Sequence, residues 1–329
     1  MRRFTENEID PQLIRDTRVA MLGYGSQGRA QALNLRDSGV RAITIGVRNP
    51  DSASARQATD DGFPVATLAQ AAAASDLLMF MLPDEAQAGV YTEIAAACDL
   101  AGKTLGFAHG YAIRFNLIEP PADTDVILIA PKGVGPAVRA RYAAGSGVAG
   151  LVATEQDRRG DALPLALSYA AAIGCARVAI FQTTFAEECE ADLFSEQAVI
   201  VGGLTQLLRA GFDTLVDAGY APEVAWFECV AEAKLILDLI VADGFSGMFA
   251  KISNTAEFGA MQAGESVINS DTRRRMQGIL ESVRNGDFAR TWAEQVASGM
   301  TEMRRVRAAW DTQPIQTMSK EMGRLWNKG

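Results

Sequence analysis

The sequence predicts an α/β domain built on a doubly wound parallel sheet, followed by an all-helical domain. Three observations predict this order. Short apolar segments alternate with helical patterns in the first half, a glycine-rich turn follows the first apolar segment, and only helical periodicity remains from about Thr184 onward. Continuous apolar strands separated by helices are typical of a parallel sheet covered on both faces. We therefore expect two domains, residues 1–183 and 184–329.

The predicted elements follow from these patterns. The candidate strands are Arg18–Gly23, Ala42–Val47, Asp76–Pro83, Lys103–His109, Asp125–Pro131, Gly150–Thr154 and Ala176–Gln182. Helical spacing is found over Leu68–Ala74, Glu85–Cys98, Glu188–Ala210, Pro222–Ala242 and Ser270–Val283.

Composition excludes several functional classes. The 329 residues carry 31 Lys and Arg against 40 Asp and Glu, a net charge of −9, whereas nucleic-acid binding needs a clustered basic surface. The four cysteines have no CxxC spacing and fit a reducing cytoplasm. The N-terminus has no apolar segment of a secretory signal, and no uncharged apolar run reaches the roughly 20 residues of a membrane span. We expect a cytoplasmic protein without a nucleic-acid or membrane partner.

His109 is the one histidine of the chain. Its isolation excludes a histidine-rich zinc site and an HExxH protease motif. A metal must therefore be held mainly by carboxylates, which favour hard ions such as Mg²⁺.

A glycine-rich turn joins the first predicted strand to a helix, with the sequence Gly23-Tyr24-Gly25-Ser26-Gln27-Gly28. Gly23 permits the tight turn, Gly25 lets the backbone approach a pyrophosphate, and Gly28 lets helix and strand pack closely. The helix N-terminus then presents free N–H groups to phosphates. A plain βα turn is the alternative, but the position at the start of an α/β domain favours a Rossmann-like dinucleotide site.

The end of the second predicted strand bears on the choice of nicotinamide cofactor. An NAD site normally has Asp or Glu there for the ribose 2′-hydroxyl, and this chain has Arg48, followed by Ser52 and Ser54. An arginine and two hydroxyl donors suit a 2′-phosphate, so we expect NADPH. Asp51 would repel that phosphate or bind a ribose diol, so NADH stays open.

Two pairs of carboxylates lie four residues apart in the helical half, Asp192 with Glu196 and Glu228 with Glu232. Residues four apart share one face of a helix, so each pair points two carboxylates the same way. In apolar surroundings such pairs are costly without a cation, and four carboxylates from two facing helices suit two Mg²⁺ ions. The alternative is a solvated helix face, with Lys234 paired to a neighbouring carboxylate.

These segments together resemble the short, class I type of ketol-acid reductoisomerase over nearly the whole chain. In the N-terminal half the matching motifs are Gly23–Gly28 (GYGSQG), Leu82–Gln87 (LPDEAQ), Phe107–Gly110 (FAHG) and Ala130–Gly133 (APKG). In the C-terminal half they are Thr184–Glu188 (TFAEE), Asp192–Gln197 (DLFSEQ), Phe227–Cys229 (FEC), Lys234–Ile236 (KLI) and Ile252–Glu257 (ISNTAE).

The resemblance implies a Rossmann domain followed by a knotted helical domain that builds a homodimer or a higher oligomer of dimers. It also implies an activity, the conversion of 2-acetolactate or 2-aceto-2-hydroxybutyrate to a dihydroxy acid in valine and isoleucine synthesis. In that reaction Mg²⁺ serves an alkyl migration, and NADPH then reduces the new ketone.

Roles for individual residues are implied by position. Asp192 resembles the carboxylate that bridges both metals, and Glu196 a further ligand of one ion. Glu228 and Glu232 resemble ligands of the other ion, contributed across the dimer interface. Ser253 matches the serine that holds the substrate carboxylate.

The remaining motif positions imply catalytic and cofactor residues. Lys132 resembles the active-site lysine, which adds positive charge near the reacting oxygens, and His109 resembles the histidine at the edge of the site. Glu232 is the candidate acceptor for the proton of the tertiary hydroxyl. Further cofactor contacts are expected at Asp84, Gln87 and Gly135.

Several positions depart from the family pattern. Where the family usually has histidine, this chain has Arg29, Arg114, Pro136 and Ala231. Two alternatives follow. One is a diverged paralogue that acts on a different 2-hydroxy-3-keto acid in a specialised pathway, and the other is a non-catalytic NADP(H)-binding protein. The second would be expected to have lost the four carboxylates, which are intact.

Overall fold

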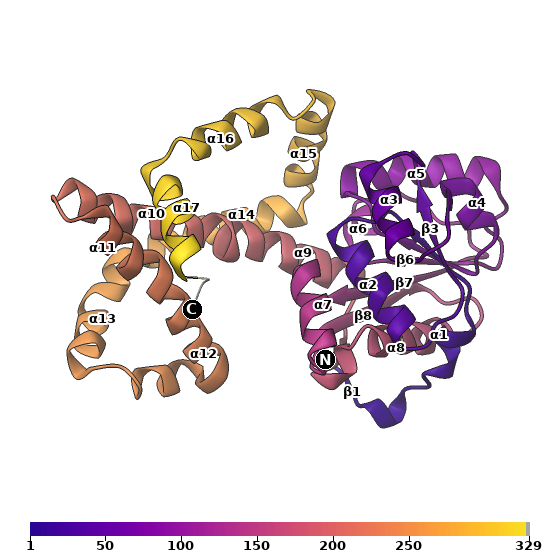
Figure 1. Ribbon diagram of the computed structural model, residues 1–329, viewed down its shortest axis with the longest axis horizontal. Helices are drawn as coiled ribbons and strands as arrows, with labels where there is room; N and C mark the ends of the chain where they lie inside the picture. The colour runs from indigo at the N-terminus through magenta and orange to yellow at the C-terminus, as the bar shows by residue number, and fades with distance from the viewer. Residues whose placement is uncertain (327–329) are drawn as a thin grey trace. The chain divides into compact units, whose positions relative to one another are not determined.

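The computed structural model describes residues 1–326, which form two compact units (Figure 1). Unit 1 is Met1–Ala191, and unit 2 begins at Asp192. The division between them falls inside helix α9 (Phe185–Ser195), and the boundary predicted at 183/184 lies just before the start of that helix.

Unit 1 contains a nine-stranded sheet in the order β1-β9-β8-β7-β6-β5-β2-β3-β4. Its strands are β1 (Arg3–Phe4), β2 (Val19–Leu22), β3 (Ile43–Val47), β4 (Val65–Thr67), β5 (Leu77–Phe80), β6 (Thr104–Phe107), β7 (Asp125–Pro131), β8 (Gly150–Gln156) and β9 (Ile180–Gln182). The helices of this unit before α9 are α1 (Gln12–Asp16), α2 (Ser26–Asp37), α3 (Ala53–Asp60), α4 (Leu68–Ala73), α5 (Asp84–Ala97), α6 (Tyr111–Arg114), α7 (Gly135–Ala143) and α8 (Ala162–Ala172).

The strands β4, β3, β2, β5, β6 and β7 are parallel, as predicted. The doubly wound parallel sheet is confirmed, and its other side is mixed, because β8 runs antiparallel to β7 and β1 runs antiparallel to β9. Pro131 at the end of β7 pairs with Gly150 at the start of β8, so the chain enters β8 at the same end of the strands at which it left β7. An apolar run does not indicate whether the strand it forms runs parallel or antiparallel to its neighbour.

The other strand predictions need small corrections. The segment Ala176–Gln182 begins with a 3₁₀ turn, Cys175–Arg177, and only its last three residues form β9. The sequence pattern did not indicate β1 and β4, which are two and three residues long and therefore too short to show an alternation.

Helices cover both faces of the sheet (Figure 1), because alternate side chains of each strand point to opposite sides. In β2, Val19 and Met21 lie in the hydrophobic cluster that includes residues of α2, α3 and α8. Ala20 and Leu22 lie in the cluster that includes residues of α4, α5 and α6. The doubly wound architecture is thus the direct result of a strand that is apolar at every position.

Unit 2 is helical in its described part. Beyond α9 its helices are α10 (Gly202–Asp217), α11 (Pro222–Trp226), α12 (Glu232–Phe249), α13 (Asn254–Val267), α14 (Ser270–Arg284), α15 (Asp287–Ala297), α16 (Thr301–Asp311) and α17 (Pro314–Trp326). Two of the predicted helical segments are not continuous α-helices. Glu188–Ala210 is interrupted by a first π-helix, Glu196–Ile200, and Pro222–Ala242 by a second π-helix, Phe227–Ala231.

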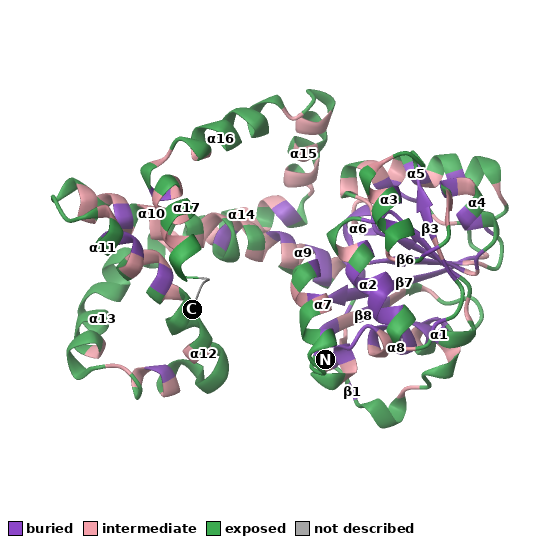
Figure 2. Cartoon of the chain, viewed as in Figure 1, coloured by how far each residue is buried: buried purple, intermediate pink, exposed green. Residues whose placement is uncertain are grey.

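Burial differs between the two units (Figure 2). In unit 1 the central strands β2, β3, β5, β6 and β7 are almost entirely buried, whereas the helices of unit 2 are largely exposed in the single chain. The exposed side chains of unit 2 include large apolar ones such as Val241, Phe245, Phe258 and Met261, which are 86%, 70%, 64% and 65% exposed. Exposed apolar side chains that gather into a contiguous patch usually mark an interaction site.

One helical run, Phe185–Asp217, has the length and composition of a membrane-crossing helix, with a mean hydropathy of 1.3 over its most apolar window. Only 6% of that window is buried inside the single chain. The sequence expectation of no membrane span considered only uncharged apolar runs, and this run carries charged residues.

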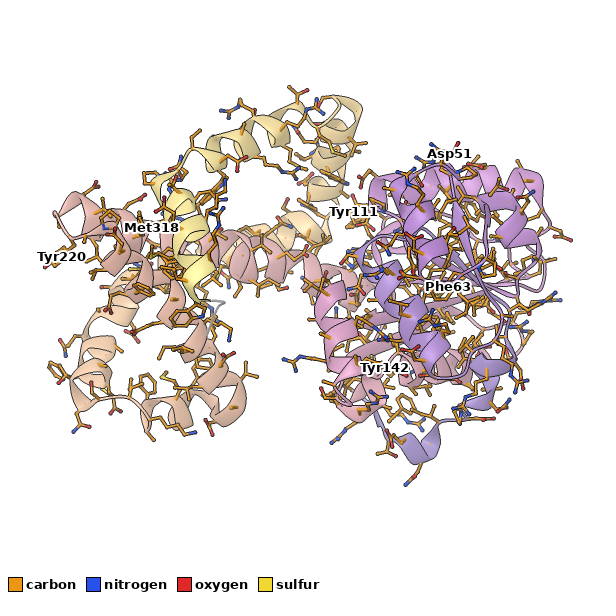
Figure 3. All side chains as sticks on the ribbon, in the orientation of Figure 1. Asp51, Phe63, Tyr111, Tyr142, Tyr220 and Met318 are labelled. Atoms are coloured by element: carbon orange, nitrogen blue, oxygen red, sulfur yellow. The ribbon has the colours of Figure 1, made fainter. Side chains whose placement is uncertain are left out.

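We predict that Tyr169→Phe lowers the free energy of unfolding by about 1–3 kcal/mol, because it leaves a buried acceptor without its donor. The Tyr169 hydroxyl donates to Gln31 Oε1 at 2.9 Å, and both residues are fully buried. Urea denaturation at fixed protein concentration measures the change. The matched control is Tyr220→Phe, since Tyr220 is 58% exposed and points outward in Figure 3; we expect a change within about 0.5 kcal/mol. Equal stability of the two variants would refute the prediction.

Candidate active site

The carboxyl ends of two neighbouring parallel strands bring two predicted catalytic residues to the same edge of the sheet. β6 ends at Phe107 and is followed by His109, and β7 ends at Pro131 and is followed by Lys132. Open α/β sheets bind their ligands at this edge. The structure thus brings His109 and Lys132 to the carboxyl ends of neighbouring strands.

Glu188 joins these two residues. Lys132 Nζ donates to Glu188 Oε1 at 2.8 Å, and the backbone N–H of Gly110 donates to Oε2 at 2.9 Å. His109 Nδ1 lies 3.1 Å from the same Oε2. The side chain of Glu188 is only 1% exposed, so these three partners together replace its hydration shell.

The partners decide the charge of the cluster. Burial alone would raise the pKa of Glu188, but the hydrogen bonds and charges of His109 and Lys132 outweigh it and hold that pKa at about 2. Burial alone would likewise lower the pKa of His109, yet its hydrogen bonds to Cys189 and Glu188, together with the carboxylate charge, raise it to about 11. The site thus contains a carboxylate and an imidazolium at neutral pH.

Asp192 follows Glu188 by one turn of the continuous helix α9. One potential ligand atom each of His109, Glu188 and Asp192 lies within 4.8 Å of the other two. Across residues 1–326 this is the one group of three such side chains. Carboxylate oxygens are the ligands that Mg²⁺ prefers, so Glu188 and Asp192, one turn apart on α9, fit a hard divalent cation. His109 would not be a ligand while its imidazole is protonated.

The other three predicted metal ligands are exposed in the single chain. The apolar surroundings inferred from the sequence do not enclose them in the single chain, because flanking residues such as Val199 and Leu235 are exposed as well. A helical side chain is buried only where another element packs over it, and neighbours in sequence do not decide that.

The backbone around these ligands is unusual. Glu196 begins the first π-helix, in which the Val201 N–H donates to the Glu196 carbonyl at 3.1 Å. Glu228 lies inside the second π-helix and Glu232 directly follows it. Both π-helices contact α10. Single π-turns inserted into α-helices frequently occur at functional sites.

Lys234 pairs with a neighbouring carboxylate, as the alternative interpretation expected, and this carboxylate is Asp238 and not one of the predicted metal ligands. Lys234 Nζ lies 2.5 Å from Asp238 Oδ2, one turn further along α12. The charge of Lys234 is therefore directed to Asp238.

The glycine-rich turn has the geometry expected of a cofactor turn. Gly23 has a φ of 101°, and a Cβ there would lie 2.8 Å from the Met81 carbonyl oxygen. A Cβ at Gly28 would lie 2.5 Å from the Gly23 carbonyl oxygen. Gly25, in contrast, faces open space with no atom within 4 Å of an added Cβ. The turn is thus packed closely on the protein side and open where a pyrophosphate would approach.

Polar side chains of the predicted cofactor residues hold the surrounding loops. Tyr24 donates its hydroxyl to Asp61 Oδ2 at 2.9 Å, and Gln27 Nε2 donates to the Gly133 carbonyl at 2.8 Å. Gln87 Nε2 donates to the Leu82 carbonyl at 3.0 Å and to Asp84 Oδ1 at 3.1 Å. Among residues 1–326 the buried Oε1 of Gln87 has no hydrogen-bond partner, so an acceptor is left beside this loop.

The residues predicted for the 2′-phosphate lie at the start of α3. Ser52 Oγ accepts the Ala55 N–H at 3.2 Å as the N-cap of that helix, and it lies 3.2 Å from Ser54 Oγ. Arg48 is exposed at the end of β3. A cavity of about 620 Å³ is lined by residues that include Tyr24, Gly25, Ser26, Ser54 and Gly135.

Ser253 is the N-cap of α13, with its Oγ accepting the Ala256 N–H at 3.2 Å. It is exposed in unit 2. An exposed serine at a helix N-terminus is well placed to meet a carboxylate.

Two residues of this region were missed by sequence reasoning. Glu188 belongs to the motif Thr184–Glu188 but was not predicted as a site residue. The available signal was the pair of cationic residues, His109 and Lys132, after adjacent strands, because such a pair needs an anion nearby and the acidic motif ends at Glu188. Asp61 was not considered at all. It accepts from Tyr24 and also from Arg29, whose Nε lies 2.6 Å away, and no local sequence pattern reveals that contact.

Comparison with known proteins decides the family. Residues 13–179 match the model of the acetohydroxy acid isomeroreductase NADPH-binding domain, and residues 185–327 match that of the ketol-acid reductoisomerase C-terminal domain. The chain belongs to the ketol-acid reductoisomerase family. It is similar to the solved structure of an NADH-preferring ketol-acid reductoisomerase from an uncultured archean, with 39% identity, 99% of each chain covered and a TM-score of 0.95.

More distant structures share the fold alone. One is a semialdehyde dehydrogenase NAD-binding protein from Cupriavidus necator in complex with calcium and NAD, with 18% identity, 82% of this chain and 99% of that chain covered, and a TM-score of 0.63. Another is a pyrroline carboxylate reductase from Plasmodium falciparum with NADP bound, with 10% identity, 83% and 98% covered, and a TM-score of 0.52. The apolar run Phe185–Asp217 lies within the matched ketol-acid reductoisomerase C-terminal domain.

We predict that the imidazole of His109 stays protonated from pH 6 to pH 9 in the metal-free protein. A folded-state pKa of about 11, above the ordinary 6.5, means that the pair with Glu188 stabilises the fold fully below about pH 6.5 and loses this contribution as the pH rises through 11. In Glu188→Gln we expect the pKa of His109 to fall, because the hydrogen bond and the charge of the Glu188 carboxylate no longer offset the effect of burial.

Imidazole ¹⁵N NMR tests this directly, because the chain has one histidine and gives one set of ring signals. The matched control is Glu187→Gln, an exposed neighbour on α9, which should leave the titration unchanged. A wild-type titration midpoint near 6.5 would contradict the prediction.

Proposed function

We propose that the protein is a Mg²⁺-dependent isomeroreductase that converts 2-acetolactate or 2-aceto-2-hydroxybutyrate to the dihydroxy acid with NADPH, in valine and isoleucine synthesis. The observation that carries this proposal is the cluster of His109, Lys132 and Glu188 beside the carboxylates of α9, at the carboxyl edge of a dinucleotide-binding sheet. Family membership supplies the reaction class.

The residues divide the proposed work among them. Asp192, Glu196, Glu228 and Glu232 would hold two Mg²⁺ ions, which polarise the hydroxyl and carbonyl oxygens of the substrate. Lys132 adds positive charge where negative charge develops, and Ser253 binds the substrate carboxylate. Glu232 accepts the proton of the tertiary hydroxyl. The buried Glu188 orients Lys132 and His109 for these roles.

A different 2-hydroxy-3-keto acid as the natural substrate is the second candidate. Arg114 stands where the family usually has histidine, and its Nε donates to Glu190 Oε1 at 2.8 Å. Glu190 lies on α9 between Glu188 and Asp192, so this ion pair brings a new cation to the edge of the site. A changed charge there favours a changed substrate.

NADPH is the proposed cofactor, and NADH is the alternative. Arg48, Ser52 and Ser54 support the 2′-phosphate, because Ser52 and Ser54 present their hydroxyls at the N-terminus of α3 next to an exposed arginine. The similar structure from an uncultured archean is NADH-preferring, and Asp51 would serve a ribose diol.

A homodimer or a higher oligomer of dimers is part of the proposal, supported by the large apolar side chains that unit 2 exposes. The four cysteines are free, which supports a cytoplasmic location. The net charge of −9 supports the absence of a nucleic-acid partner, and we propose no membrane partner.

Purified protein with Mg²⁺, NADPH and racemic 2-acetolactate should oxidise the cofactor, followed at 340 nm. Glu232→Gln should lower kcat by roughly 100-fold or more, because it removes the proton acceptor and a metal ligand. The matched control is Glu294→Gln, an exposed glutamate of α15, which should retain full activity. Tight NADPH binding without turnover of either acetohydroxy acid would reject these substrates and favour the second candidate.

Arg48→Ala should raise the KM for NADPH by about 10- to 100-fold through loss of a charge-assisted hydrogen bond, and should leave the KM for NADH unchanged. Arg41→Ala is the control, because Arg41 is exposed and precedes the amino end of β3, whereas Arg48 follows its carboxyl end. Steady-state kinetics with both cofactors give the result. A wild type that prefers NADH, or an equal effect of Arg48→Ala on both cofactors, would refute the assignment.

A further inference from the structure

Helix α17 packs on the segment that carries two of the proposed metal ligands. In unit 2, α17 contacts α11, and the Trp226 Nε1–H at the end of α11 donates to Ser319 Oγ of α17 at 2.9 Å. Trp226 is 5% exposed. A buried indole N–H without an acceptor is costly, so this hydrogen bond fixes the indole relative to α17.

The second π-helix is held at both ends by one small core. The core consists of Phe212, Ala225, Trp226, Ala231 and Ile315. Met318 of α17, labelled in Figure 3, packs against it. Trp226 immediately precedes the π-helix and Ala231 is its last residue, so Glu228 projects from a turn whose two flanks are buried.

The aromatic contacts continue into the backbone of the π-helix. The Phe227 ring meets Trp226 edge-on with centroids 5.3 Å apart, and it lies 6.2 Å from the ring of Trp326 at the end of α17. The Phe227 carbonyl accepts the backbone N–H of Glu232. Phe227, whose ring contacts Trp326 of α17, therefore also accepts the backbone hydrogen bond of Glu232, the second ligand of the pair.

The register of this turn matters because each residue of an α-helix turns the chain by about 100°. A π-turn accommodates one extra residue, and its i→i+5 hydrogen bonds are rare and confined to short stretches. If the turn relaxed to α-helical hydrogen bonding, Glu232 and everything after it would rotate by about one residue relative to Glu228. The two carboxylates would then no longer keep the same relative direction.

We propose that Trp226 and Ser319 are positioning residues for the metal-ligand pair Glu228 and Glu232, with α17 acting as the support that keeps the π-register. This inference rests on the proposed function for the identity of the ligands. Neither residue is proposed to touch the metal or the substrate.

The test measures Mn²⁺ binding to the full-length assembled protein by electron paramagnetic resonance, alongside NADPH binding by fluorescence. Ser319→Ala should raise the Kd for Mn²⁺ roughly tenfold, as is typical when a group behind a metal ligand is removed. The Kd for NADPH should stay within about twofold, because the cofactor turn lies in unit 1. Ser319→Thr retains the hydroxyl and should restore wild-type Mn²⁺ binding. Ser298→Ala removes an exposed intrahelical hydrogen bond and is the matched control.

Trp226→Phe supplies an independent arm, because it removes the donor and keeps an aromatic ring. The double variant Trp226→Phe/Ser319→Ala should bind Mn²⁺ no more weakly than either single variant, since both changes break one hydrogen bond. Additive losses in the double variant would overturn the inference.

The remaining outcomes separate this inference from the proposed function. If Glu232→Gln leaves Mn²⁺ binding unchanged, the proposed ligand set itself fails. If Glu232→Gln weakens Mn²⁺ binding and Ser319→Ala does not, the positioning role fails alone. A parallel loss of Mn²⁺ affinity, NADPH affinity and thermal stability in both Ser319→Ala and Trp226→Phe would show a general effect on folding and also overturn the inference.

Discussion

The carboxylate of Glu188 lies where water barely reaches it, and its ionisation is sustained entirely by neighbouring donors. A buried carboxylate without such partners would take up a proton or destabilise its surroundings. Because the partners follow the ends of β6 and β7, one charge ties two strand ends to the first turns of α9. Packing reinforces the tie, since Phe185 of α9 meets Phe107 of β6 edge-on with centroids 6.1 Å apart. The position of α9, and of every carboxylate it carries, depends on this arrangement.

The charge balance of the cluster explains why acidic residues accumulate on α9. His109 and Lys132 both contact the carboxylate of Glu188, and the pKa of His109, raised to about 11, keeps the imidazole charged at neutral pH. Asp192, one turn along the helix, adds a further carboxylate within reach of the cluster. The cationic groups of such a site attract an acidic ligand, and its carboxylates attract a cation. This combination suits a reaction that needs both a metal and a carboxylate substrate.

Much of unit 1 was predictable because a strand buried on both faces leaves an unbroken apolar run. Asp125–Pro131 was predicted with the bounds of β7, and the glycine turn was placed correctly because Gly23 and Gly28 are required sterically. The direction of β8 was not predictable, since pairing with β7 is decided by where the chain returns. Glu188 was not predicted for a related reason. A charged residue is buried only where tertiary partners compensate its charge, and those partners are distant in the sequence.

The four-residue spacing of the predicted ligands illustrates what sequence spacing can and cannot decide. The interpretation that each pair shares a face assumed ordinary α-helical geometry, yet Glu228 lies within a π-helix and Glu196 begins one. Such a turn leaves no local signature in the sequence, because the extra residue is accommodated by hydrogen bonds and not by a special residue type. Helix α10 packs against both π-helices, and α17 contacts α11, which directly precedes the second of them. The direction of these carboxylates is therefore a property of the helical core, and the spacing alone is compatible with more than one direction.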